Sequence, residues 1–72
     1  EISAINSEFI DTNFTNAALY RANLSRSVVT NSNFENSWLY RCVFSNAKIT
    51  DCNFYLAKSQ KVRWPSDFRL EN

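Results

Sequence analysis

Residues 13–17 read Asn-Phe-Thr-Asn-Ala, residues 33–37 read Asn-Phe-Glu-Asn-Ser, and residues 53–57 read Asn-Phe-Tyr-Leu-Ala. The same stretch therefore returns at an offset of twenty residues, with phenylalanine in second place and a small residue in fifth place each time. An internal repeat of this length is typical of a stacked architecture, in which each unit buries its apolar face against its neighbours.

A shorter period of five residues underlies the period of twenty. Counting in fives, one series of positions holds only Phe, Leu, Ile or Val: Phe9, Phe14, Leu19, Leu24, Val29, Phe34, Leu39, Phe44, Ile49 and Phe54. A second series holds only small residues: Ser7, Thr12, Ala17, Ala22, Ser27, Ser32, Ser37, Cys42, Ala47, Cys52 and Ala57. Because residues two apart in an extended segment point to the same side, each unit sends one large and one small side chain inward. Four units of five residues per twenty predict a coil with four sides.

Stacking such coils about 4.8 Å apart, the ordinary spacing between strands, predicts columns of equivalent residues. Phe14, Phe34 and Phe54 are expected to form one internal column. Their neighbours Asn13, Asn33 and Asn53 are expected to form an external column whose amides hydrogen-bond along the stack, as in other stacked-strand structures.

Residues 22–26 read Ala-Asn-Leu-Ser-Arg, and residues 12–14, 32–34 and 52–54 read Thr-Asn-Phe, Ser-Asn-Phe and Cys-Asn-Phe. This pattern resembles the pentapeptide-repeat family, whose consensus is Ala-(Asp/Asn)-Leu-x-x. The resemblance implies an all-β fold, a right-handed quadrilateral β-helix (a solenoid). Ten repeats predict about two and a half coils with a short C-terminal cap.

Seventy-two residues predict one domain. We expect a degenerate N-terminal repeat or cap over residues 1–6, the pentapeptide-repeat β-helix over 7–58, and a C-terminal cap or tail over 59–72. Residues 64–68 read Trp-Pro-Ser-Asp-Phe, which is similar to the Trp-Pro-x-Gly-Phe tail of many family members. Solenoids need capped ends, and the candidate lid over the last coil consists of Val62, Trp64, Phe68 and Leu70. The alternative is that the same side chains form a dimerisation patch, which would give a homodimer through a coil end.

The sequence offers little for catalysis. It has no histidine and no glycine, so a Ser-His-Asp arrangement and the usual phosphate-cradling loop are both absent. Cys42 and Cys52 fall in the small inward series and are expected to be buried free thiols. A disulfide across the core, or a metal pair without histidine, is the less favoured interpretation. We predict no catalytic, cofactor-binding or metal-binding residues, no cofactor, and a protein that is not an enzyme.

One side of the predicted coil is both aromatic and basic. It collects the candidate protein-binding residues Tyr20, Arg21, Trp38, Tyr40, Arg41 and Lys58, with Tyr40 expected to stack on Tyr20. Tyr, Trp and Arg are enriched in interface hot spots. The alternative is purely structural, because stacked aromatic pairs stabilise adjacent strands whatever the function.

The leading functional hypothesis is a non-enzymatic module that acts as a scaffold or binds an unidentified protein. The resemblance supplies an alternative, since some family members mimic duplex DNA and bind type II topoisomerases such as gyrase, giving quinolone tolerance. That mimicry needs a long acidic rod, whereas this chain has a net charge of +1. The same net charge argues against single-stranded nucleic acid as the ligand. A further alternative is an accessory domain of a larger protein.

No apolar run in the sequence is long enough to predict a membrane span. The family is abundant in cyanobacteria and other bacteria, so the resemblance favours a bacterial protein. We expect a cytoplasmic location, and the absence of methionine leaves a processed or exported form open.

Overall fold

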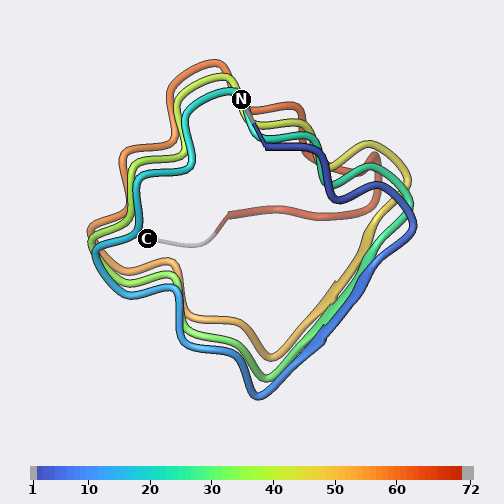
Figure 1. Cartoon of the computed structure of the whole chain (residues 1–72), viewed down its shortest axis with the longest axis horizontal. Helices are drawn as coiled ribbons and strands as arrows, with labels where there is room; N and C mark the ends of the chain where they lie inside the picture. Colours follow the sequence, from blue (N-terminus) through green and yellow to red (C-terminus); the bar gives the residue numbers. More distant parts are fainter. Residues whose placement is uncertain (1, 71–72) are drawn as a thin grey trace.

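The computed structural model describes residues 2–70. Glu1, Glu71 and Asn72 lie outside the described residues, so the outermost positions of the expected units 1–6 and 59–72 lie outside them too. Figure 1 shows a four-sided outline in which successive turns of the chain lie over one another. The described part is all-β and contains no helix.

The three named strands lie on one side of this outline. They are β1 (Glu8–Ile10), β2 (Val28–Thr30) and β3 (Lys48–Thr50), and they form one parallel sheet in the order β1-β2-β3. The register joins Phe9 to Val29 and Val29 to Ile49. Each step is the predicted offset of twenty residues.

Parallel bridges continue the same register on the other three sides. They join Asn13 to Asn33 and Asn53 on the second side, Ala18 to Trp38 and Lys58 on the third, and Ser3 to Asn23, Val43 and Arg63 on the fourth. The offset is again twenty residues throughout. The ladder on the fourth side therefore reaches Arg63, beyond the last clear match to the five-residue pattern.

Every fifth residue from Asn6 to Lys61 forms a corner and has a positive φ, between 51 and 61°. Most corners hold Asn or Asp, the non-glycine residues that tolerate this left-handed conformation best. Arg21, Arg26, Arg41, Leu56 and Lys61 are the exceptions. Hydrogen bonds such as that from the Ala22 N–H to the Leu19 carbonyl (3.1 Å) close the turns, and a positive φ at the third residue is what a type II turn requires.

The internal column of phenylalanines is present as predicted. The rings of Phe14 and Phe34 stack with their centroids 4.6 Å apart, and those of Phe34 and Phe54 stack at 4.8 Å. Phe34, Phe44, Leu39 and Val29 are fully buried. Small residues such as Ala22 and Ser37 are also fully buried, because only small side chains fit beside the large ones in so narrow a coil.

The external asparagine column behaves differently from the prediction. Asn13, Asn33 and Asn53 each accept, through Oδ1, a hydrogen bond from the backbone N–H two residues further on (each 2.9 Å). This local bond is the ordinary preference of asparagine in turns. Along the stack, the Asn53 amide donates to Glu35 of the level below (3.5 Å). Two corners make shorter bonds, from Asn36 to Asn16 and from Asn31 to Asp11 (both 2.7 Å).

The two ends of the stack differ. At the N-terminal end, Ala4 packs against the core, and its N–H donates to the Asn23 carbonyl (2.8 Å). At the C-terminal end, the last described segment crosses the four-sided outline instead of following it, as the red trace shows (Figure 1).

Candidate functional site

The aromatic–basic side consists of Tyr20, Arg21, Trp38, Tyr40, Arg41 and Lys58, and the ladder that joins Ala18, Trp38 and Lys58 brings its three levels together. Alternation along each extended segment turns the small and the large core residues inward and leaves these side chains on the outer surface. Tyr20 is 48% exposed and Trp38 is 41% exposed. The six predicted residues therefore form one outer surface.

The aromatic contacts on this side differ from the expected pairing of Tyr20 with Tyr40. The ring of Tyr20 stacks on the ring of Trp38, with centroids 6.0 Å apart and planes 20° from parallel. The residue below Trp38 in the ladder is the small Ala18. Trp38 therefore has room to lean over its diagonal neighbour Tyr20, as long aromatic side chains do on adjacent strands.

Lys58 completes this arrangement from the level above. Its Nζ lies 4.4 Å from the centroid of the Trp38 ring, a cation–π contact, and also donates to Oδ1 of Asn36. Asn36 in turn donates to Asn16. The Lys58 ammonium thus contacts both a ring and an amide.

Tyr40 lies among three cations. The guanidinium carbon of Arg41 lies 5.4 Å from its ring centroid. A hydrogen bond from Arg41 and the charges of Arg41, Lys61 and Arg21 lower the pKa of the Tyr40 hydroxyl. Arg21, Arg41 and Lys61 occupy equivalent corners, at φ of 58, 61 and 60°. The corner column therefore concentrates positive charge beside the aromatic rings.

Lys61 belongs to this site, although the sequence analysis did not select it. The signal that identifies it is simple, since Lys61 follows Arg41 by twenty residues. Asn36 was also missed. Its part in holding Lys58 depends on side-chain conformation, which spacing alone does not show.

The C-terminal candidates lie over the last turn of the stack. Trp64 stacks face to face on Phe44, with centroids 5.3 Å apart and planes 7° from parallel, and meets Phe54 edge-on at 5.2 Å. Phe68 lies against Trp64 at 4.9 Å. Val62 is partly buried against the core, whereas Leu70 is exposed.

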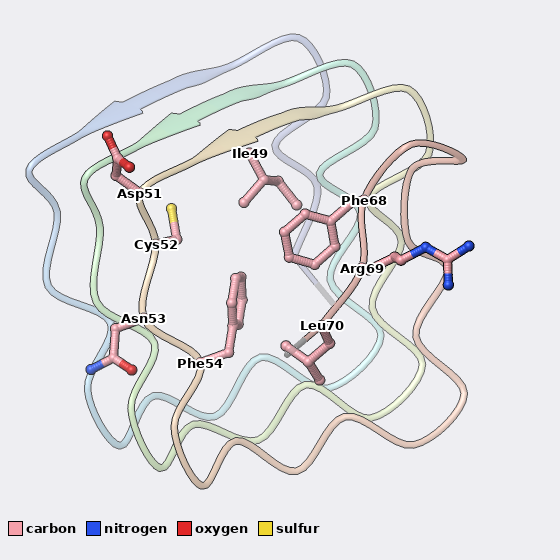
Figure 2. Close-up of a pocket in the computed structure, with 8 residues that line it drawn as sticks. All are labelled: Ile49, Asp51, Cys52, Asn53, Phe54, Phe68, Arg69 and Leu70. Carbon is pink, nitrogen blue, oxygen red and sulfur yellow. The ribbon is translucent and has the colours of Figure 1, made fainter. Parts of the chain in front are cut away.

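A hollow of about 280 Å³ lies between this segment and the last turn. Figure 2 shows Ile49, Phe54, Phe68 and Leu70 extending toward it and Arg69 pointing away. Its inward groups are mostly apolar, and no cluster of titratable groups faces it among the labelled residues. The hollow therefore has the character of a loosely packed end of the core.

The two cysteines are free thiols. Cys42 is fully buried and donates to the Leu19 carbonyl (2.7 Å), and burial raises its pKa from 9.0 to about 11. Cys52 is only partly buried, unlike the expectation, although burial still raises the pKa of its thiol. A raised pKa keeps a thiol protonated and poorly nucleophilic at neutral pH. Within residues 2–70, no group of three or more His, Cys, Asp or Glu could hold a metal ion, and no helix is long and apolar enough to cross a membrane.

A family model for pentapeptide repeats matches the chain in eight copies, over residues 7–46 and 30–58. The chain belongs to the pentapeptide-repeat family. A comparison with curated proteins found no match. Proteins built from pentapeptide repeats are generally non-enzymatic, and the family implies a β-helix, which agrees with the all-β structure and its parallel sheet.

Proposed function

We propose that this pentapeptide-repeat protein is a non-enzymatic scaffold that binds another protein through the aromatic–basic side. The observation that carries the proposal is the series of contacts from Tyr20 to Trp38 and from Trp38 to Lys58. Aromatic and cationic side chains that are already fixed lose little conformational entropy on binding, so more of the contact energy becomes affinity. Trp38 and Lys58 are also partners in the parallel ladder, so the experiment has to separate binding from strand pairing.

The proposal includes finer features of the architecture. The right-handed sense, the two and a half coils and the unit boundaries at residues 6 and 58 remain predictions from the repeat. Val62, Trp64, Phe68 and Leu70 are proposed to close the C-terminal end, because Trp64 and Phe68 rest on Phe44 and Phe54. Homodimerisation through this end is the competing proposal, and sedimentation of wild type and a Leu70→Ser variant would separate the two.

The DNA-mimic alternative has less support. The described part measures 25 × 24 × 21 Å, which is not a rod. Its aromatic–basic side is also cationic, whereas a duplex mimic needs acidic surface. A gyrase supercoiling assay tests this alternative, and inhibition or protection at micromolar protein would favour it over the scaffold.

The proposed function is tested by affinity capture from an extract of the source cells. The site variant carries Tyr20→Ser, Trp38→Ser and Arg41→Asn, and the matched control carries Tyr55→Ser, Ile10→Ser and Lys48→Gln. Tyr55 and Ile10 are exposed and lie on other sides, so both variants lose two exposed apolar side chains and one cation. We expect a partner that wild type and control retain and that the site variant loses.

Circular dichroism would first establish that all three proteins keep the same β-rich fold. A partner retained equally by the site variant and the control would mean that the aromatic–basic side is cross-coil packing and that binding lies elsewhere.

A further inference from the structure

The small net charge of +1 conceals two oppositely charged halves of the molecule. Within residues 17–26, 37–46 and 57–63, the third and fourth sides contain no Asp or Glu and hold six cations: Arg21, Arg26, Arg41, Lys58, Lys61 and Arg63. In the sequence before these ranges, Glu1 precedes Arg21 by twenty residues. We call the third and fourth sides the basic half. The first and second sides, residues 7–16, 27–36 and 47–56, hold four carboxylates and the single cation Lys48. The near-neutral total therefore says little about the field at either surface.

The separation is clearest at two opposite corners. Arg21, Arg41 and Lys61 lie twenty residues apart at one corner, and Asp11, Asn31 and Asp51 lie at the corner ten residues away, across the coil. Stacked levels are about 4.8 Å apart, so three cations stand within roughly 10 Å of one another. Like charges opposite each other on adjacent strands destabilise a sheet. A ligand that supplied negative charge beside Arg41 and Lys61 would relieve the repulsion between these two.

Whether the aromatic ring faces are open or covered indicates which kind of anion this surface can bind. Single-stranded nucleic acid binds by stacking its bases on open aromatic faces. Here Trp38 has Tyr20 against it and the Lys58 ammonium over its ring, and Tyr40 has the Arg41 guanidinium over its ring. Tyr20 and Lys58 therefore occupy Trp38, and Arg41 occupies one face of Tyr40, which leaves fewer open faces for bases. The Arg41 guanidinium and the Lys58 and Lys61 ammonium groups each carry several N–H donors, which match carboxylates.

We propose that the basic half binds an extended, Asp- and Glu-rich segment of a partner protein, whose carboxylates engage Arg41 and Lys61 of the corner column and the Lys58 ammonium. This inference rests on the proposed protein-binding function and names the chemistry of the partner. Five residues of extended chain span about 17 Å, which is within the 25 × 24 × 21 Å extents of the molecule. The lowered pKa of Tyr40, caused mainly by Arg41, agrees with a strongly positive surface at this point.

The test uses a fluorescein-labelled peptide of ten glutamates as the probe and measures fluorescence anisotropy. The site variant is Arg41→Asn with Lys61→Asn, and the control is Lys48→Gln with Arg69→Gln. Both lose two cations, so their net charge is identical. Asparagine already occupies the equivalent corners at Asn6, Asn16, Asn31, Asn36 and Asn46, so the site variant is expected to fold.

We expect the wild type and the control to bind the peptide with similar affinity. The site variant should bind the peptide about tenfold more weakly, because it lacks two partly exposed charge contacts. Raising the salt concentration should weaken binding of the wild type more than binding of the site variant.

Three outcomes would overturn the inference. Equal losses in both variants would mean that net charge, not the corner column, governs binding. Tighter binding of a labelled oligothymidylate of the same charge would identify a nucleic-acid surface instead. If the peptide does not bind but the capture experiment still yields a partner that needs Tyr20 and Trp38, the proposed function stands and its acidic partner is excluded.

Discussion

The indole of Trp64 lies parallel to the ring of Phe44, with centroids 5.3 Å apart and planes only 7° from parallel. Trp64 follows Phe44 by twenty residues, as Phe44 follows Leu24. The tryptophan thus continues an internal column of the stack after the five-residue pattern has ended. Its contact with Phe54 ties the same side chain to a second column.

Replacing Trp64 with alanine should destabilise the whole protein. The change removes two aromatic contacts and opens the end of the core to water, which should lower the free energy of unfolding by about 3 kcal/mol. Urea unfolding followed by circular dichroism measures this loss. Trp38→Ala is the matched control, because Trp38 is exposed and should cost no more than about 1 kcal/mol. Similar losses for the two tryptophans would refute the cap.

Two buried serines should respond differently to alanine substitution. Ser27 Oγ accepts from the Ser7 N–H (3.1 Å) and donates to the Ala4 carbonyl (2.8 Å), so it joins the first two levels of the stack. Ser27→Ala removes the side-chain partner of the Ser7 N–H and of the Ala4 carbonyl. It should lower the free energy of unfolding by roughly 2 kcal/mol. Ser37 Oγ donates only to the Phe34 carbonyl (2.7 Å), which the Ser37 N–H also reaches (3.1 Å).

Ser37→Ala therefore leaves the Phe34 carbonyl with a hydrogen bond and should cost about 1 kcal/mol or less. Thermal unfolding of the two variants side by side gives the comparison. The prediction fails if Ser37→Ala is the more harmful change.

Leu56 offers a stabilising substitution. It is 58% exposed and sits at a corner with φ of 59°, where a leucine side chain crowds the backbone. Leu56→Asn should raise the free energy of unfolding by about 1 kcal/mol, because asparagine tolerates this conformation and the lost side chain buries little. The control is Tyr55→Asn, at the neighbouring exposed position without positive φ. Equal effects at both positions would show that backbone strain is not the cause.

Much of this fold can be predicted from spacing, because a coil with four flat sides fixes which residues share a column. The Phe14, Phe34 and Phe54 column and the outward position of Tyr20 and Trp38 follow from counting alone. Spacing does not determine the conformations of the side chains on the outer surface. Trp38 covers Tyr20 because Ala18 leaves space, and Asn33 bonds to its own turn because a local partner is always within reach. Both outcomes depend on local competition between contacts.

The separation of positive and negative charge becomes visible only when the residues are placed on the sides of the coil. Along the sequence, cations and carboxylates alternate in blocks of about ten residues, so the net charge of the whole chain is only +1. Only when the blocks are stacked at twenty residues do Arg21, Arg41 and Lys61 come together. Charges of one sign thus recur about every twenty residues, which is one turn of the coil, so they gather on one surface.

Cys42 should make stability fall with pH in the alkaline range. Its thiol is buried with a pKa raised from 9.0 to about 11, so the folded protein keeps this proton at pH values where the unfolded chain loses it. The contribution is fully present below pH 9.0 and disappears as the pH rises toward about 11. Urea unfolding of the wild type at pH 8.0 and at pH 10.5 should therefore show a clear decrease in the free energy of unfolding.

The Cys42→Ala variant separates this effect from the titration of tyrosines and lysines over the same range. Alanine fills the same small inward position, as Ala22 does one level below. The variant has no thiol there to titrate, so its free energy of unfolding should decrease less between the two pH values than that of the wild type. The comparison uses each protein's own change with pH, so any fixed cost of losing the bond to Leu19 cancels. Parallel decreases in the two proteins would mean that the Cys42 proton is not held by the fold.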